Sequence, residues 1–340
     1  MRGIARTLST STEHYAHAGL TACSHMVHLA GGHQLHVRQI VQADDGRSKK
    51  RPVAMLLHGA LANGRMFYSD KALGLGPFLA RRGFNVFVPD LRGRGRSTPS
   101  IASEPSHSMH ASIVEDLPAI VCRVAELSGR KQQSWAAHSW GGVLLQAALA
   151  RDHQFARDHC ESLTLFGTKK HISAPQTWRE RRDYLTDITL GWRFLCPLIA
   201  RRYGYLPARQ LGIGGDDETQ AYVEDSGQWV DSTNEEWVDP TDGFDYLAAH
   251  RALGDAQPPT WHIAAANDTV RGNPRDVQSW ASATGSNRQG TDQFTVLSHA
   301  AGNLEDYDHN SMLLSKLAPK DTHFDAVADW MLRHSAQAAH

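Results

Sequence analysis

The segment Ser134-Trp-Ala-Ala-His-Ser-Trp-Gly-Gly142, which runs directly into the apolar stretch 143–150, has the clearest chemical potential in the chain. Its pattern predicts a buried strand, a turn at Ser139 and then a helix, an arrangement that holds a serine at the tip of a tight, strained turn. Such a turn needs small residues two positions before and after the serine, and Ala137 and Gly141 stand there. Glycine is usual at both positions, so Ala137 departs from the pattern by one methyl group. The segment predicts a nucleophilic serine.

A serine hydroxyl is a weak nucleophile, so it needs a base that is itself oriented by an acid. Asp268 directly follows the strand-like segment 260–266, and sites in parallel sheets gather at that end of the strands. His309 lies in the loop between the last expected strand, 293–297, and the last expected helix. Because loop on both sides lets a side chain reach across to the serine, His309 is the preferred base. His299, at the end of the same strand, is the alternative.

Attack by a serine on a carbonyl also needs backbone N–H groups that stabilise the developing oxyanion. One is expected from Trp140, which directly follows the serine. The other is expected from the loop after the strand that ends at His58-Gly59, with Ala60 preferred and Leu61 as the weaker choice. Both donors belong to the backbone, so the side chains at these positions do not test the assignment.

These residues must be positioned by the alternation of strands and helices that runs through most of the chain. Strands are expected on both sides of the turn Gly31-Gly32 within 25–41, and at 52–57, 84–89, 134–138, 162–166, 260–266 and 293–297. Helices are expected at 71–82, at 113–127, after Ser139, from 273 and at 323–333. Strands that alternate with helices predict an α/β fold with a mostly parallel sheet covered on both faces.

The alternation stops between residues 171 and 254. This segment has no clear strand and many aromatic residues, and Pro197 and Pro207 divide it into short helices. The aromatic and aliphatic side chains of Trp192-Arg-Phe-Leu195 and Leu198-Ile199 suggest an apolar pocket above the serine. Packing of the same aromatics onto the rest of the molecule is an equal alternative.

Together these features resemble the α/β-hydrolase fold family over nearly the whole chain. The resemblance rests on His58-Gly59-Ala60, on Asp90-Leu-Arg-Gly-Arg-Gly-Arg-Ser97, on the turn Ala137-His-Ser-Trp-Gly141, and on Asp268 and His309 in the order Ser, Asp, His. It implies a hydrolase core at 25–170 and 255–335, a helical cap inserted at 171–254 and an N-terminal extension at 1–24. Esterase- and lipase-like members of the family are the most similar.

The resemblance implies a serine hydrolase that cleaves carboxylic esters of medium or long apolar acyl groups through an acyl-enzyme on Ser139. His309 would act as the base, Asp268 would orient it, and neither a cofactor nor a metal is implied. The same three residues would also serve an acyltransferase or an amide or C–C hydrolase. A ligand receptor with little turnover is a further alternative, because fold alone does not decide function.

Composition restricts the partners of the chain. Its 340 residues carry a net charge of -1, with 41% hydrophobic and 21% charged residues, which is typical of a globular protein that binds neither nucleic acid nor anionic lipid. No apolar run approaches the ~20 residues of a membrane span. Four scattered cysteines and an N-terminus without the apolar core of a secretory signal favour the cytoplasm. The oligomeric state is not indicated.

Histidines and two short basic runs are the other conspicuous features. The twenty histidines include four pairs three residues apart: His14/His17, His25/His28, His33/His36 and His107/His110. A zinc site needs a further ligand, and none follows at helical spacing, so we expect surface histidines. The basic runs 47–51 and 92–96 are expected to be solvated loops, although the resemblance makes the second one a loop of the fold.

Overall fold

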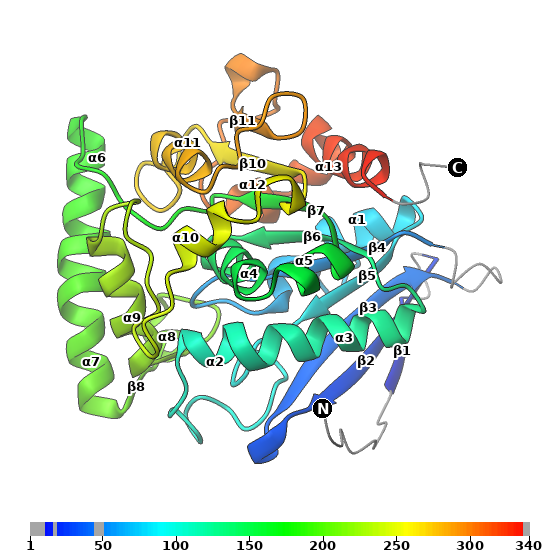
Figure 1. Cartoon of the computed structure of the whole chain (residues 1–340), viewed down its shortest axis with the longest axis horizontal. Helices are drawn as coiled ribbons and strands as arrows, with labels where there is room; N and C mark the ends of the chain where they lie inside the picture. Colours follow the sequence, from blue (N-terminus) through cyan, green and yellow to red (C-terminus); the bar gives the residue numbers. More distant parts are fainter. Residues whose placement is uncertain (1–10, 16–18, 44–50, 336–340) are drawn as a thin grey trace.

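A computed structural model of the chain describes residues 11–15, 19–43 and 51–335. Its centre is a nine-stranded sheet in the order β1-β2-β3-β5-β4-β6-β7-β10-β11 (Figure 1). The strands are β1 (Ser11–Tyr15), β2 (Leu20–His28), β3 (Gln34–Gln42), β4 (Val53–Leu57), β5 (Asn85–Pro89), β6 (Gln133–His138), β7 (Cys160–Phe166), β10 (Thr260–Ala265) and β11 (Gln293–Leu297). Strands β1 to β3 pair antiparallel, and β5 to β11 pair parallel. The predicted mostly parallel sheet is confirmed.

Helices cover both faces of this sheet, as the alternation predicts. They are α1 (Leu75–Arg81), α3 (Leu117–Ser128), α4 (Trp140–Arg151), α5 (His153–His159), α11 (Pro274–Ala283), α12 (Ser311–Leu314) and α13 (Thr322–Arg333). Strand β4 shows why two layers form, because its side chains alternate between two apolar clusters. Val53, Met55 and Leu57 join the cluster beneath α3 and α4, whereas Ala54 and Leu56 join the cluster beneath α1 and α13. A strand buried on both faces reads as a continuous apolar run.

Two helices differ from their predicted extents for local reasons. Helix α1 begins at Leu75 rather than near Lys71, because Gly74 has φ 109° and a Cβ there would lie 2.5 Å from the carbonyl oxygen of Phe67. The helix predicted at 113–127 begins earlier, with α2 (Met109–Ala111) and a π-helical turn, and it ends at Gly129 with φ 70°. Glycine tolerates such a left-handed backbone, so it terminates the helix.

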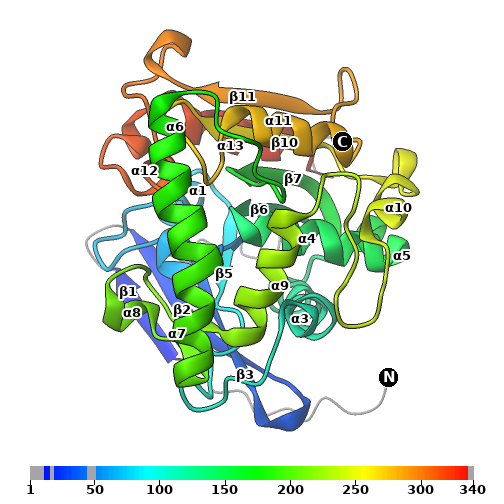
Figure 2. The same cartoon turned by 90° about the vertical axis from the view of Figure 1, so that its left-hand side faces the viewer.

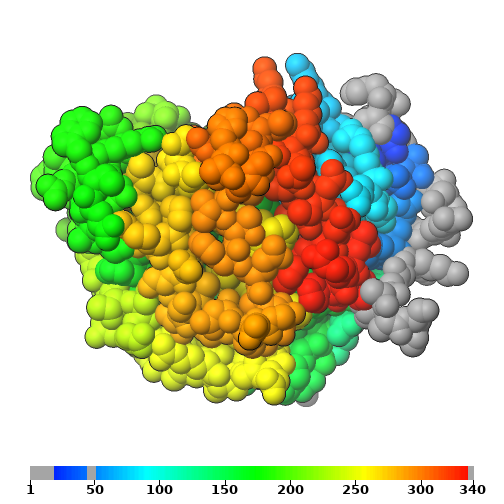
Figure 3. Space-filling view, turned by 90° about the horizontal axis from the view of Figure 1, so that it is seen from above, coloured from blue at the N-terminus to red at the C-terminus, as the bar shows by residue number. Residues whose placement is uncertain are grey.

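Residues 171–254, here called the cap, form a helical layer beyond the sheet. Its helices are α6 (Trp178–Asp183), the π-helical η5 (Tyr184–Leu195), α7 (Cys196–Tyr203), α8 (Ala208–Leu211), α9 (Gln220–Asp231) and α10 (Tyr246–Arg251). The first three follow one another as one long rod in front of the sheet (Figure 2). The expectation of no strand in this segment was wrong in one place, where β8 (Tyr205–Leu206) pairs with β9 (Glu218–Thr219). The rod lies at the end of the molecule opposite the N-terminal strands (Figure 3).

The basic run 92–96 is not a solvated loop. Arg92 is 6% exposed and Arg94 is 1% exposed. Arg92 donates from Nε to Asp116 Oδ1 at 2.9 Å, and Arg94 pairs with Glu218 of β9. A buried guanidinium requires such partners, and the cap supplies one of them from far along the chain. Of the other basic run, residues 47–50 lie outside the described residues.

The expectation of surface histidines was also wrong for several of the paired ones. His25, His36 and His107 are buried, and the His36 ring bonds to Asp90 from Nδ1 at 2.8 Å and contacts Ser24 through Nε2 at 3.0 Å. They are buried because β2, β3 and the loop before α2 pack against neighbouring segments of the core. Of the pair His14/His17, His17 lies outside the described residues, so the prediction is not tested there. Within the described part of the chain, no helix has the length and apolarity needed to cross a membrane.

Candidate active site

Ser139 stands at the sharp turn between β6 and α4, so the predicted strand, turn and helix are present. Its backbone has φ 53° and ψ -127°, a conformation that an L-residue adopts only under constraint. The backbone N–H of Ser139 donates to the carbonyl oxygen of Phe166 at 2.8 Å, which fixes the turn against β7. A Cβ at Gly141 would lie 2.4 Å from the carbonyl oxygen of His58, so only glycine fits there. Ala137 is fully buried in the core and is accommodated.

Asp268 and His309 lie together beside this turn. Asp268 follows β10, and His309 comes from the loop after β11, where its Nδ1 lies 2.6 Å from Asp268 Oδ2. Burial by itself would raise the pKa of the Asp268 carboxyl. The charge and hydrogen bond of His309, together with the backbone N–H of Gly272, outweigh burial and lower that pKa below its ordinary value. Asp268 is therefore an anion that holds Nδ1 of His309 protonated and leaves Nε2 available as a base.

The serine and the histidine line one cavity but are not hydrogen-bonded to each other. Among the described residues, Ser139 Oγ has no hydrogen-bond partner. Hydrogen bonds of this kind are often long in structures without substrate and tighten in the complex. The alternative base His299 is exposed, and its Nδ1 lies 3.1 Å from the carbonyl oxygen of Asn303. The structure brings Ser139, Asp268 and His309 together and leaves His299 outside.

His138 was not predicted from the sequence, yet it packs directly against His309. The two ring centroids are 4.5 Å apart, and His138 Nε2 donates to the carbonyl oxygen of His309 at 2.8 Å. Burial, followed by the neighbouring His309, lowers the pKa of His138 to about 3. A neutral His138 therefore supports the backbone of His309 without competing for protons. Its only sequence signal is its place immediately before Ser139.

The backbone donors near Ser139 fall into two groups. Leu61 N–H donates to Glu218 Oε2 at 3.3 Å, so it is engaged by the cap. The N–H groups of Ala60 and Trp140 donate to no acceptor among the described residues, and both residues line the cavity. Trp140 is also the first residue of α4, where the helix dipole favours negative charge. Of the two sequence candidates in the first loop, the free donor is at Ala60.

The cavity has a volume of about 480 Å³ and opens between the sheet and the cap. Its apolar lining comes from both parts of the molecule: Leu61, Met66, Trp140, Ile172, Ile188, Trp192, Ile213, Val230 and Leu314. Of the residues suggested from the sequence, Trp192 lines the cavity, whereas the expectation was wrong for Phe194, Leu195, Leu198 and Ile199, which are not part of its lining. The polar and charged lining includes Asn63, Arg65, Lys169, Asp187, Arg271 and Asn310.

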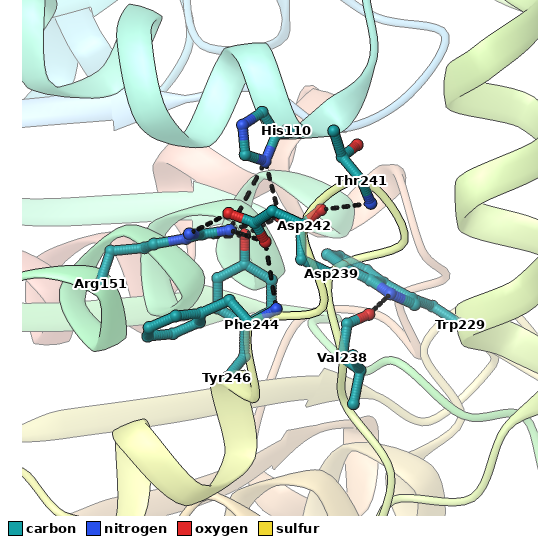
Figure 4. Close-up of polar contacts among 9 residues, drawn as sticks. All are labelled: His110, Arg151, Trp229, Val238, Asp239, Thr241, Asp242, Phe244 and Tyr246. Carbon is teal, nitrogen blue, oxygen red and sulfur yellow. Dashed lines mark hydrogen bonds and ion pairs between the residues drawn. The ribbon is translucent and has the colours of Figure 1, made fainter.

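A second polar cluster, drawn in Figure 4, shares no residue with the lining of this cavity. Ligand atoms of His110, Asp239 and Asp242 lie within 4.8 Å of one another, a spacing that would suit a metal ion. Arg151 already occupies the cluster, with Nη2 lying 2.7 Å from Asp239 Oδ2 and Nη1 lying 2.7 Å from Asp242 Oδ2. The guanidinium binds both carboxylates, so the cluster fits an anchor between α4 and the end of the cap rather than a metal centre.

Comparisons with known proteins agree with this architecture. A sequence model of the alpha/beta hydrolase fold matches residues 52–199. A monoglyceride lipase from Saccharomyces cerevisiae, solved as a soluble variant with a substrate analogue, superposes with a TM-score of 0.61 at 14% identity over 92% of this chain and 95% of that one. A thermophilic esterase from Thermogutta terrifontis has a TM-score of 0.54 at 18% identity over 92% and 99%.

An N-acyl homoserine lactonase, AidH, has a TM-score of 0.53 at 16% identity over 92% of this chain and 97% of that one. No curated protein sequence matches the chain. The chain has the α/β-hydrolase fold, as the resemblance in its sequence implies. At these identities the solved structures establish the fold, whereas the substrate must be argued from the site.

Proposed function

We propose that this protein is a serine hydrolase that cleaves carboxylic esters of apolar, medium- or long-chain acyl groups. One observation carries the proposal: a serine held at φ 53° lines the same cavity as a histidine whose Nδ1 is bound by a buried aspartate. Strain at that turn keeps the hydroxyl exposed to the cavity, and the pair supplies a base of fixed orientation. In this proposal residues 25–170 and 255–335 are the hydrolase core, residues 171–254 are the cap and residues 1–24 are an N-terminal extension.

Each residue then has a defined role in acyl transfer. His309 Nε2 takes the proton from Ser139 Oγ as the hydroxyl attacks the ester carbonyl, while Asp268 stabilises the imidazolium that forms. The oxyanion accepts hydrogen bonds from Ala60 N–H and Trp140 N–H. His309 gives its proton to the leaving alcohol, which breaks the ester C–O bond and leaves the acyl group on Ser139. Water, deprotonated by His309, then attacks the acyl carbon, the bond to Ser139 Oγ breaks, and His309 returns its proton to that oxygen as the acid leaves.

The lining of the cavity supports the choice of substrate. A volume of about 480 Å³ lies within the range of pockets that bury a whole small molecule. Aliphatic and indole side chains supply most of its walls, and burial of methylene groups against them favours an apolar acyl chain by about 0.8 kcal/mol per group.

A receptor with little turnover is the second candidate, because Ser139 Oγ has no hydrogen bond to His309 or to any other described residue. An acyltransferase or an amide or C–C hydrolase would use the same groups. Adding an alcohol during turnover separates transfer from hydrolysis, since a transferase would form the new ester in preference to the free acid.

The test is hydrolysis of p-nitrophenyl esters from acetate to palmitate by the wild type, by Ser139→Ala and by Ser100→Ala. Ser100 is an exposed serine outside the cavity, so its variant controls for the substitution itself. The proposal expects an optimum at one chain length, loss of turnover in Ser139→Ala and wild-type rates in Ser100→Ala. Turnover that survives in Ser139→Ala, or none in the folded wild type, would refute it.

A further inference from the structure

Lys169 is a buried cation inside the candidate catalytic cavity that the mechanism above does not use. It lies in the loop after β7, immediately after Thr168, whose Oγ1 donates to the carbonyl oxygen of Ser139 at 3.1 Å. In the same loop, a Cβ at Gly167 would lie 2.9 Å from Nδ1 of His309. The loop therefore contacts both the serine and the histidine. Lys169 is the next residue of this loop, and it lines the same cavity as Ser139 and His309.

The ammonium group of Lys169 lacks the partners that its burial demands. The residue is 6% exposed, and it makes no hydrogen bond or ion pair with any residue that the structure describes. Burial lowers its pKa to about 8, and the nearby carboxylates of Asp276 and Asp268 counteract only part of that effect. Both carboxylates are bound elsewhere, Asp276 by Ser173 and Asp268 by His309.

Its neighbour Lys170 shows what a structural lysine looks like at the same burial. Lys170 is fully buried, and its Nζ donates to the carbonyl oxygens of Trp229 at 3.0 Å and Thr233 at 2.8 Å and to Ser232 Oγ at 2.6 Å. With the carbonyl oxygen of Ser232 at 3.4 Å, the chain thus supplies four acceptors to Lys170 and, among the described residues, none to Lys169. Buried polar groups are normally satisfied, so an unsatisfied one facing a cavity indicates a missing ligand.

The other charged side chains of the cavity are already paired. Arg271 contacts Asp187 at 2.9 Å, and Arg65 contacts Asp70 at 2.5 Å. Lys169 is then the one cation of the cavity lining, within the described ranges, whose charge no side chain neutralises by direct contact. An anion entering the cavity finds an uncompensated positive charge at one place only.

We propose that Lys169 binds a carboxylate of the substrate, so that the esters hydrolysed here carry one carboxylate group besides the ester. This inference rests on the proposed function and narrows its substrate class from apolar esters to esters with an apolar chain and an acidic group. The carboxylate accepts the hydrogen bonds that Lys169 lacks and replaces the water around it. The apolar walls bind the remainder of the molecule.

The first test compares substrates of equal length that differ in charge. One series is the p-nitrophenyl monoesters of glutaric, adipic and suberic acids, each beside its ω-methyl ester. A second carries the carboxylate on the alcohol side, as 4-acetoxy-3-nitrobenzoate beside its methyl ester. We expect the wild type to prefer the charged member of at least one pair at least tenfold in kcat/KM. A hydrogen bond to a charged group is the physical basis of that preference.

The variants are Lys169→Met, Lys169→Arg and the control Lys131→Met. Lys131 is an exposed cation paired with Asp158 outside the cavity, so its variant should retain the wild-type preference. Lys169→Met should lower the preference for the carboxylate by about 10- to 150-fold, mainly through KM, and Lys169→Arg should retain part of it. Lys169→Met should also raise Tm, because it removes a buried charge without partners. A structural lysine would instead lower Tm.

A binding measurement separates this inference from the proposed function. Monomethyl adipate should raise Tm of Ser139→Ala more than dimethyl adipate does, and the difference should vanish in Ser139→Ala/Lys169→Met. If esters are hydrolysed but Lys169→Met leaves the charge preference unchanged, the inference about Lys169 is overturned and the proposed function stands. If no ester is hydrolysed, the proposed function fails, and the shift of Tm by the carboxylate alone decides whether Lys169 binds anions.

Discussion

The buried ion pair between Arg94 and Glu218 joins the core to the cap and yields a quantitative prediction. The Arg94 side chain is 1% exposed and that of Glu218 is fully buried. Arg94 also lies over the ring of Tyr222, 5.0 Å from its centroid. The substitution Glu218→Gln keeps the size of the side chain but leaves the Arg94 guanidinium without its counter-charge in a site that water does not reach. Removal of one partner from such a pair costs about 3–5 kcal/mol of stability.

Urea unfolding followed by tryptophan fluorescence measures this cost. The double variant Arg94→Met/Glu218→Leu should lose less than the sum of its single variants, because no charge is left unpaired. Arg82→Gln is the matched control, since Arg82 contacts Asp329 at 2.7 Å on the surface and should cost less than about 1 kcal/mol. If Glu218→Gln unfolds within 1 kcal/mol of the wild type, the pair does not hold the cap as we argue.

The Glu218→Gln substitution should also lower kcat, because Glu218 contacts the loop that carries a proposed oxyanion donor. Glu218 accepts the N–H of Leu61, which is the next residue after the proposed oxyanion donor Ala60. Loosening this contact would misplace a donor that must be fixed before the reaction begins, and loss of one such donor costs about 10²- to 10³-fold in kcat. If Glu218→Gln is destabilised but retains full kcat, the contact between Glu218 and Leu61 stabilises the fold without positioning the oxyanion donor, and this prediction is refuted.

Two further predictions concern the buried titratable groups. Asp268→Asn should lower kcat by roughly four orders of magnitude with little change in Tm, because the amide keeps its shape but no longer holds Nδ1 of His309 protonated; ester turnover and thermal unfolding measure the two effects. His262→Leu should raise stability at pH 7 by about 1–3 kcal/mol, since both ring nitrogens of His262 are buried without hydrogen-bond partners in the described structure. Burial lowers the pKa of His262 from 6.5 to about 3, against a smaller opposing effect of Asp292, so the unfolded chain binds a proton that the folded one does not. The contribution of the neutral ring to stability is fully present above pH 6.5 and falls as the pH drops toward 3. By pH 5 the resulting loss in the free energy of unfolding is about 2 kcal/mol. Urea unfolding at pH 7 and pH 5 should detect this loss in the wild type and not in His262→Leu.

Simple controls decide both predictions. Asp308→Asn is the control for Asp268→Asn, because Asp308 stands beside His309 in sequence but is exposed and accepts from the backbone of Asn310 and Ser311. Equal losses of kcat in the two variants would contradict the proposal that Asp268 in particular orients His309. For His262, an unchanged difference in stability between pH 7 and pH 5 after substitution would show that the proton is taken up elsewhere.

The proposed triad could be predicted from the sequence because each of its members carries a local signal. Ser139 is marked by the small residues that its turn requires. Asp268 and His309 are marked by their places after β10 and β11, and the chain order of strands fixes the end of the sheet at which they meet. Ala60 is also preferred over Leu61 on the sequence alone, and the structure adds a physical reason, because Glu218 engages the amide of Leu61.

The features that sequence reasoning missed depend on partners far away in the chain. Arg94 reads as part of a solvated basic run because Glu218, which makes its burial possible, lies more than one hundred residues further on in the cap. Lys169 and Lys170 are adjacent lysines that the sequence does not distinguish. In the structure, α9 and the segment after it supply acceptors to Lys170 only. Burial of charge is a property of the assembled layers, so composition and spacing do not reveal it.

The contacts of the cap divide it into a fixed part and a less constrained one. Three buried or half-buried cations outside the cap bind β9, α9 or the segment after α9, and they are Lys170, Arg94 and Arg151. The rod of residues 178–203 has no comparable buried ion pair among the described residues, and it exposes Trp178 at 76% and Phe194 at 62%. Its inner side nevertheless lines the cavity through Ile188 and Trp192. The rod is therefore held by apolar contacts and by solvent-exposed ion pairs such as that of Arg193 with Asp231. Both kinds of contact tolerate displacement better than buried ion pairs do, because water solvates exposed charges when they separate.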